Sequence, residues 1–162
     1  MDPFSASMGI EVAVSVLGAL AKSREHLVRL LDAVRGARDK KTVWYAMCDQ
    51  LGSNCRVLDP LLQNLEVEMR NGQHSQPTQE RVQDVVEVLG FALVDGVRLV
   101  MECQDASTVT LFFRGEGMKE KFRKVAVRIA ECLRNIPLAA FQSTLEIQRD
   151  VKSIVSSLKA AR

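Results

Sequence analysis

Apolar side chains recur every three or four residues along most of this 162-residue chain. One such run steps through Trp44, Met47, Leu51, Cys55, Leu58, Leu62, Leu65 and Met69. A second run steps through Val82, Val85, Val86, Leu89, Leu93, Val97, Val100 and Cys103. This spacing places an apolar stripe along one side of an α-helix, whereas a half-buried strand alternates every second residue. The chain is therefore predicted to be all-α.

Residues that break helices are few, so the helices are expected to be long. The chain has nine glycines and four prolines, while 47% of its residues are apolar. The first helix is predicted to close in a turn at 35–39 and the second to run over 40–70. Pro60 is expected to kink the second helix, because proline has no N–H for the carbonyl four residues earlier. Gly72 is expected to end it.

Two more helices follow in the sequence. Thr78 is the predicted cap of the third helix. Within it, Gly90 and Gly96 are expected to let another helix approach closely. The fourth helix is predicted to stop at Pro137 and to turn six residues inward: Met118, Phe122, Val125, Ile129, Cys132 and Leu133.

The predicted architecture is an antiparallel four-helix bundle over residues 1–140. A capping box at 143–146 opens an additional C-terminal helix within residues 141–162. This last helix is expected either to brace the bundle or to link it to a downstream domain.

The first helix differs from the others because residues 8–21 have almost no polar side. Such a helix is either buried on all sides or directed to lipid. Residues 4–21 would span about 27 Å, close to the ~30 Å hydrocarbon core of a bilayer. The predicted membrane-insertion residues are Met8, Ile10, Glu11, Val12, Val14, Val16, Leu17 and Leu20. The alternative, that this helix fills the centre of the bundle, remains open at this point.

The net charge of +2 conceals blocks of opposite sign. Residues 22–41 hold seven basic and three acidic side chains, residues 42–113 four and ten, and residues 114–134 seven and three. Two basic clusters are candidate contacts for lipid headgroups: Lys22, Arg35, Arg38, Lys40 and Lys41, then Lys119, Lys121, Arg123, Lys124 and Arg128. Each basic residue near an anionic membrane contributes about 1 kcal/mol. The alternative is a pair of solvated helix faces.

Motifs that carry catalysis or cofactor binding are missing from the sequence. It has no G-x-S-x-G, H-E-x-x-H, P-loop or G-x-G-x-x-G pattern, so neither an enzyme nor a cofactor is expected. The four cysteines form no C-x-x-C pair and are expected to be reduced core residues without a metal. Nucleic acid is not an expected partner, because aromatic residues are only 5% of the chain.

Several stretches resemble one known family. Residues 48–51 (CDQL) and 57–62 (VLDPLL) resemble the second helix of the N-terminal bundle in the mixed lineage kinase domain-like family. Cys103, residues 106–107 and residues 122–129 resemble its passage from the third helix to the fourth. The opening MDPFSA resembles fungal HeLo domains, and residues 89–137 are similar to the helical domain that precedes the U-box in plant ubiquitin ligases. Coiled-coil domains of plant immune receptors share this broad architecture.

The resemblance implies a cytoplasmic domain of cell-death or innate immune signalling. Such a domain self-associates, is released by a downstream kinase-like or nucleotide-binding domain of the same chain, and moves to the plasma membrane. There it would contact anionic phospholipid and form a pore. The ubiquitin-ligase branch implies a different function, a non-enzymatic adaptor that binds other proteins. A bundle that only restrains a downstream domain is a third possibility.

Overall fold

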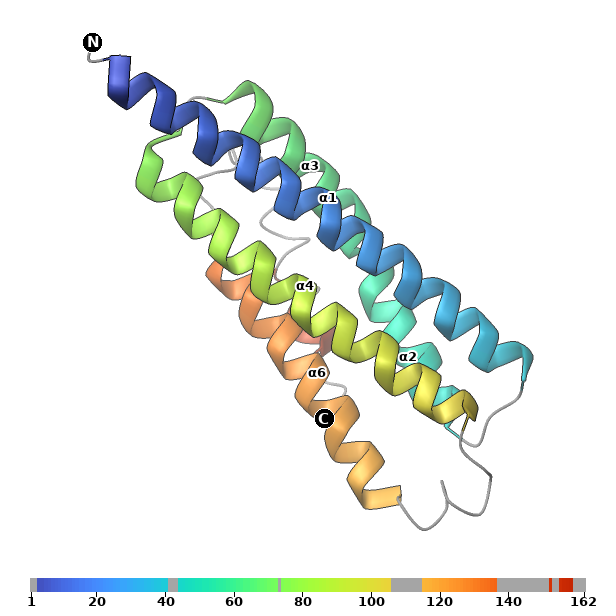
Figure 1. Cartoon of the computed structure of the whole chain (residues 1–162). Coiled ribbons are helices and arrows are strands. Elements are labelled where there is room, and N and C mark those ends of the chain that lie inside the picture. Colours follow the sequence, from blue (N-terminus) through green and yellow to red (C-terminus); the bar gives the residue numbers. More distant parts are fainter. Residues whose placement is uncertain are drawn as a thin grey trace.

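A computed structural model describes residues 3–40, 44–72, 74–105, 115–136, 152 and 155–158 of the chain. The main elements are α1 (Pro3–Asp39), α2 (Tyr45–Arg56), α3 (Leu58–Asn71), α4 (Gln76–Asp105) and α6 (Gly115–Asn135). These helices pack side by side along their length (Figure 1). The described part of the chain contains no strand, and the predicted all-α class is confirmed there.

α2 and α3 run together in the direction opposite to α1, and α4 then runs parallel to α1 (Figure 1). Ser23 donates a hydrogen bond to the Val86 carbonyl at 2.9 Å. Further along both helices, Gln104 donates to the Ala33 carbonyl at 2.7 Å. The contact between α1 and α4 is the most extensive between any two described helices. The most extensive contact among the described helices therefore joins a parallel pair, α1 and α4.

The predicted second helix is two helices, so the prediction of one kinked helix was wrong. α2 ends at Arg56, α3 begins at Leu58, and Val57 stands between them. Pro60 lies in the first turn of α3, where its N–H would lack a partner within the helix in any case. Its ring would collide with the Arg56 carbonyl in a continuous helix, which explains why the break precedes the proline.

Two predicted helix ends were also misplaced. α1 continues through 35–39, where a turn was expected, because Val34 and Ala37 are buried against the bundle and hold the last turns in place. α4 begins at Gln76, before the predicted cap, Thr78. The Ser75 hydroxyl takes the capping role instead and accepts a hydrogen bond from the Thr78 N–H at 3.3 Å. Proline is tolerated in the first turn of a helix, so Pro77 does not delay its start.

Gly72 does end α3, as predicted, with its N–H bonded to the Glu68 carbonyl at 2.7 Å. The apolar stripes also face the core as predicted. On α3, Leu58, Leu62 and Leu65 are buried. On α6, all six predicted inward residues are buried. Leu158, near the end of the chain, is buried as well, while Pro137 and most of the predicted fifth helix lie outside the described residues.

Candidate functional site

Small residues bring α1 and α4 close together near their middle. Ser23 is 1% exposed. A Cβ atom added to Gly90 would lie 3.1 Å from the Ser23 hydroxyl oxygen. A Cβ atom on Gly96 would lie 3.4 Å from a methyl carbon of Leu30. Both glycines therefore permit the close approach that the sequence predicted.

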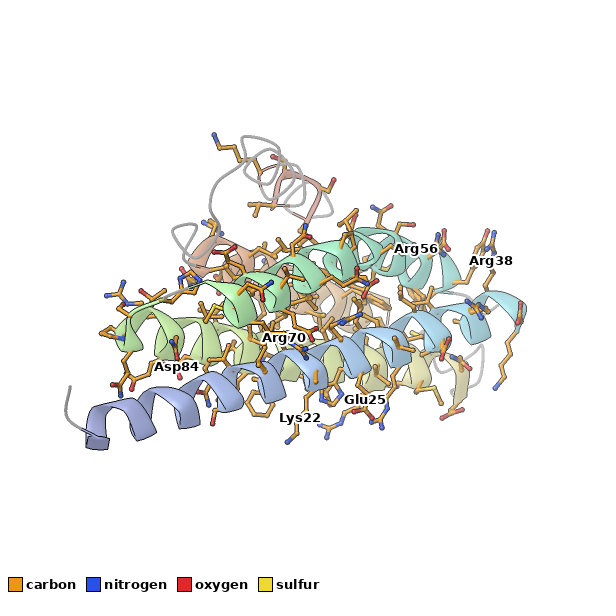
Figure 2. All side chains as sticks on the ribbon, turned by 90° about the horizontal axis from the view of Figure 1, so that it is seen from above. Lys22, Glu25, Arg38, Arg56, Arg70 and Asp84 are labelled. Atoms are coloured by element: carbon orange, nitrogen blue, oxygen red, sulfur yellow. The ribbon has the colours of Figure 1, made fainter. Side chains whose placement is uncertain are left out.

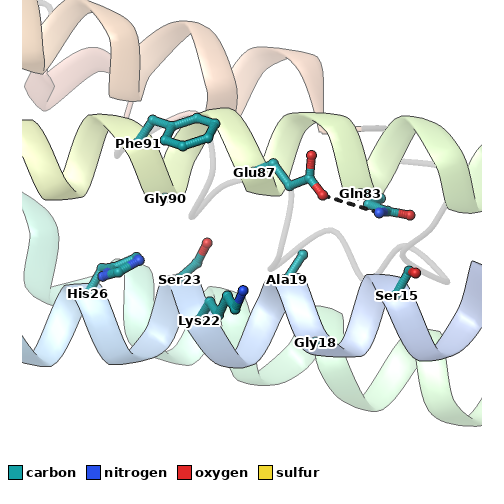
Figure 3. A pocket seen from close by; sticks show the side chains of 10 residues that line it. All are labelled: Ser15, Gly18, Ala19, Lys22, Ser23, His26, Gln83, Glu87, Gly90 and Phe91. Carbon is teal, nitrogen blue, oxygen red and sulfur yellow. Dashed lines mark hydrogen bonds between the residues drawn. The ribbon is translucent and has the colours of Figure 1, made fainter.

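A hollow of about 550 Å³ opens to the surface above this contact. We call it the α1–α4 groove, and Figure 3 shows it from close by. It is lined by Ser15, Gly18, Ala19, Lys22, Ser23 and His26 of α1 and by Gln83, Glu87, Gly90 and Phe91 of α4. Most of the residues on the α1 wall are small, so the groove has room to receive side chains of another protein.

Phe91 stands at the edge of the groove with 65% of its surface exposed. Val88, one helical turn before it, is 46% exposed. Fully burying a side chain of this size is worth about 1.5–3 kcal/mol, so leaving it in water forgoes that gain. An exposed aromatic ring beside a hollow of small residues is typical of a protein contact site.

The two walls of the groove carry opposite charges. Lys22 comes from α1 and Glu87 from α4, and both side chains are exposed (Figure 3). The amide of Gln83 donates a hydrogen bond to the Glu87 carboxylate at 3.1 Å, which steadies that carboxylate on its wall. A partner can therefore be oriented by charge as well as by shape.

The predicted membrane-insertion residues fall into two groups. Val16 and Leu20 are fully buried in the core, and Leu17 packs partly buried against it. The side chains of Met8, Ile10, Glu11, Val12 and Val14 lie outside the described residues. No helix within the part of the chain that the structure describes is long and apolar enough to cross a membrane. The described part of the insertion face thus fills the bundle, the alternative that the sequence left open.

The first predicted basic cluster does not come together as one patch. Lys22 precedes Arg35 by thirteen residues of continuous helix, a separation of about 20 Å. Figure 2 shows Lys22 and Arg38 far apart along α1. Arg35, Arg38 and Lys40 are exposed together at the end of this helix, and Lys41 lies outside the described residues. We call these three residues the basic end of α1.

Several residues of the second predicted basic cluster form ion pairs with carboxylates. Lys121 lies 3.3 Å from Glu102, and Arg128 is paired with Asp95. Arg123 donates to Glu120 at 2.9 Å, and this hydrogen bond holds the pKa of Glu120 below its usual range. Lys119 and Lys124 are also exposed on α6. The sequence could not reveal the first two pairs, because their carboxylates come from α4.

None of the four cysteines lines the α1–α4 groove. All four cysteines are buried and free. Hydrogen bonding with Cys103 of α4, and then burial, raise the pKa of the Cys48 thiol on α2, while the same interaction lowers the pKa of Cys103, a pairing that the sequence did not predict. Burial raises the pKa of Cys55 to about 12 and that of Cys132 to about 11. Among the described residues, no three His, Cys, Asp or Glu side chains are grouped closely enough to hold a metal ion.

The chain was compared with protein-family models, with curated proteins and with solved structures, and none of them matches it. The α1–α4 groove and the basic end of α1 must therefore be interpreted from their own chemistry.

Proposed function

We propose that this chain is a non-enzymatic bundle that self-associates through the α1–α4 groove. The observation that carries the proposal is the exposed ring of Phe91 at the edge of a hollow whose α1 wall consists mostly of small residues. A two-fold symmetric contact uses the same patch on both copies. Each copy would supply one ring and one hollow, and Lys22 of each copy would lie opposite Glu87 of the other.

The expected affinity is modest. Burying two Phe91 rings contributes about 3–6 kcal/mol, whereas a micromolar dimer needs about 8 kcal/mol. Val88 and the two Lys22–Glu87 pairs would supply part of the difference, since exposed ion pairs are worth up to about 1 kcal/mol each. The dimer should therefore form in the range from micromolar to millimolar protein.

Sedimentation velocity between about 10 µM and 1 mM tests this range directly. The wild-type chain should shift from monomer to dimer with rising concentration, while Phe91→Glu should remain monomeric. Val67→Glu is the matched control, because Val67 is 56% exposed on α3 and lies outside the groove. Dimerisation that survives Phe91→Glu would exclude the groove as the contact.

Charge reversal tests how the two copies are oriented. Lys22→Glu and Glu87→Lys should each weaken the dimer by roughly threefold to tenfold, because each places like charges opposite one another. The double variant restores opposite charges and should recover most of the affinity. Additive losses in the double variant would show that these residues do not meet across the contact.

A second candidate function is attachment to anionic membranes through the basic end of α1. Gly115, at the start of α6, lies against Trp44 just before α2, so Lys119 belongs to the same end of the bundle. Three or four exposed basic residues near an anionic surface contribute about 3–4 kcal/mol. Insertion of α1 would additionally require Val16 and Leu20 to leave the core.

Co-sedimentation with vesicles, together with dye release from them, separates these steps. Attachment through the basic end predicts binding to vesicles containing phosphatidylserine but not to phosphatidylcholine alone, and loss of binding in the triple variant Arg35→Glu, Arg38→Glu, Lys40→Glu. Insertion of α1 predicts dye release as well. Equal binding by the triple variant would exclude the basic end as the contact.

The resemblance to cell-death bundles supports joining the two activities into one pathway. In that proposal, self-association precedes membrane permeabilisation, and a downstream kinase-like or nucleotide-binding domain restrains both.

The adaptor alternative uses the same groove for a helix of a different protein. A chain that stays monomeric up to millimolar concentration and does not bind vesicles would favour the adaptor.

A further inference from the structure

Three electron-pair donor atoms lie close together where α3 ends and the chain turns towards α4. The Nε2 atom of His74 is 3.3 Å from the main-chain oxygen of Glu68 and 3.4 Å from its carboxylate oxygen Oε1. Both side chains are largely buried, with 10% of His74 and 21% of Glu68 exposed. The surrounding structure therefore restricts where these three atoms can lie.

Hydrogen bonds do not satisfy all three atoms. Both distances from Nε2 exceed the range of about 2.7–3.2 Å for an ordinary N–H···O hydrogen bond. The Glu68 main-chain oxygen already accepts the Gly72 N–H at 2.7 Å. Glu68 Oε1 is buried and has no hydrogen-bond partner among the residues that the structure describes. A buried carboxylate oxygen without a partner is costly, so this atom points to a ligand that the hydrogen bonds do not supply.

The separations match those between ligands of one metal ion. Atoms that lie ~2.1 Å from a tetrahedral zinc ion are about 3.4 Å from one another. We propose that His74 Nε2, Glu68 Oε1 and the Glu68 main-chain oxygen bind one divalent transition-metal ion of the zinc type, with water completing its coordination. The site uses two side chains, because the third ligand is a main-chain oxygen. It is separate from the α1–α4 groove and does not depend on self-association.

Gly72 lets the three atoms approach one another. Its φ of −82° and ψ of 152° are angles that any residue adopts, so the backbone conformation does not require glycine here. A Cβ atom on residue 72 would collide first with His74 Nε2. It would also lie 2.7 Å from the Glu68 main-chain oxygen and 2.9 Å from Oε1. A side chain at this position would therefore displace the same three atoms that the ion needs.

The charge at the end of α3 suits a cation. Glu68 supplies a carboxylate, and the last carbonyls of the helix supply the negative end of its dipole. Arg70, two residues further on, is paired with Glu66 at 2.9 Å. An imidazole nitrogen favours Zn²⁺ and similar ions, whereas Mg²⁺ and Ca²⁺ prefer sites built from oxygen atoms. Gln79 of α4 donates to the His74 carbonyl at 3.0 Å, so the ion would connect the end of α3 to the start of α4.

Calorimetric titration of the whole chain with zinc chloride tests the proposal. One ion should bind per chain with a dissociation constant of roughly 1–200 µM, because the site has half the side-chain ligands of a closed zinc site. Magnesium chloride at the same concentrations should give no binding. His74→Ala and Glu68→Gln should each weaken binding at least tenfold, while His26→Ala, at the chain's other histidine, should keep it. No binding up to about 1 mM zinc, or equal affinity in His74→Ala, would overturn the proposal.

The imidazole ¹⁵N signals of the wild-type chain locate the ion without any substitution. Zinc should shift the signals of His74 and leave those of His26 unchanged, and EDTA should reverse the shift. Signals of His74 that do not move on saturation with zinc would overturn the proposal, even if a variant above fails to fold.

Gly72→Ala tests the geometry without changing a ligand. The added carbon atom should lower the affinity for zinc at least tenfold, because it displaces His74 Nε2 and both oxygens of Glu68. Gly117→Ala is the matched control, since a Cβ atom there meets nothing within 4 Å. Binding by Gly72→Ala that is as tight as that of the control would contradict the assignment of these three atoms as ligands.

Discussion

The two long seams of α4 are built differently. Against α6, α4 is closed by buried apolar side chains such as Leu99 and Val125, with the Lys121–Glu102 and Arg128–Asp95 pairs on the surface above them. Against α1, the contact is made by small residues around Ser23 and Gly90, and Phe91 remains 65% exposed. One seam is closed by buried apolar side chains, whereas the other leaves apolar surface exposed.

The largest expected effect separates the two phenylalanines. Phe122→Ala should cost about 3–5 kcal/mol of unfolding free energy, because Phe122 is buried where α6 lies beside α2 and its loss opens a cavity there. Phe91→Ala should change the stability of the monomer by less than about 0.5 kcal/mol and should abolish dimerisation. Urea unfolding at low protein concentration measures both values. Similar losses for the two variants would contradict the contrast between a buried Phe122 and an exposed Phe91.

A second large effect should come from enlarging Gly90. Gly90→Val should cost about 2–4 kcal/mol, because its added carbon atoms would meet the buried Ser23 hydroxyl and push α1 away from α4. Gly18→Ala is the matched control on the same seam, since a Cβ atom there meets nothing within 4 Å. That control should gain up to about 1 kcal/mol from helix propensity. Equal effects of the two changes would show that the α1–α4 contact is loose.

Alkaline pH should lower the free energy of unfolding of the bundle, because its buried thiols resist deprotonation. The pKa of Cys55 rises from its ordinary value of 9.0 to about 12, so the unfolded chain loses this proton first. Stability from this thiol is complete below pH 9.0 and is lost as the pH rises towards about 12. Each pH unit in that window should cost about 1.4 kcal/mol per buried thiol. Cys55→Ala should show a shallower decline in urea unfolding, and an unchanged slope would exclude Cys55 as its cause.

A smaller effect is expected from the buried hydrogen bond between Ser23 and Val86 in the α1–α4 contact. Ser23→Ala removes the donor to the Val86 carbonyl and should cost about 0.5–1.5 kcal/mol. Thermal unfolding of this variant beside Ser15→Ala, an exposed serine of the same helix, measures the difference. A loss above about 3 kcal/mol would mean that the hydroxyl has a larger role than this bond.

The smallest effect belongs to the ion pairs above the α4–α6 seam. Glu102→Gln should cost about 0.2–1 kcal/mol and less at high salt, because Lys121 and Glu102 are both partly exposed. Chemical denaturation with urea at low and high sodium chloride checks the value and its salt dependence. A loss that high salt leaves unchanged would point to packing, not charge, as the contribution of Glu102.

The inward faces of the helices could be predicted from the sequence because they depend on local periodicity. Leu62 and Phe122 follow the spacing of three and four residues, and both are buried. The parallel pairing of α1 with α4 could not be predicted, because no local pattern fixes which helices become neighbours. The Lys121–Glu102 and Cys48–Cys103 contacts join distant parts of the chain and escaped prediction for the same reason.

One part of the groove, its exposed aromatic residue, could have been predicted from the sequence. Phe91 lies off the apolar stripe of α4 and directly follows Gly90, so an outward aromatic residue beside a close helix contact could have been inferred. The small residues Gly18, Ala19 and Ser23 on α1 gave no sign of which helix they would face. Lys22 was assigned to lipid headgroups, but the structure places it on the wall of the groove.

The most direct test of self-association through the groove is a dilution series of amide ¹H–¹⁵N spectra. The account predicts concentration-dependent shifts in the groove segments 15–26 and 83–91, with the signals of α6 unchanged. Phe91→Glu should remove those shifts while the rest of its spectrum stays that of the folded chain. Spectra that do not change with concentration, or shifts confined to another face of the bundle, would contradict self-association through the α1–α4 groove.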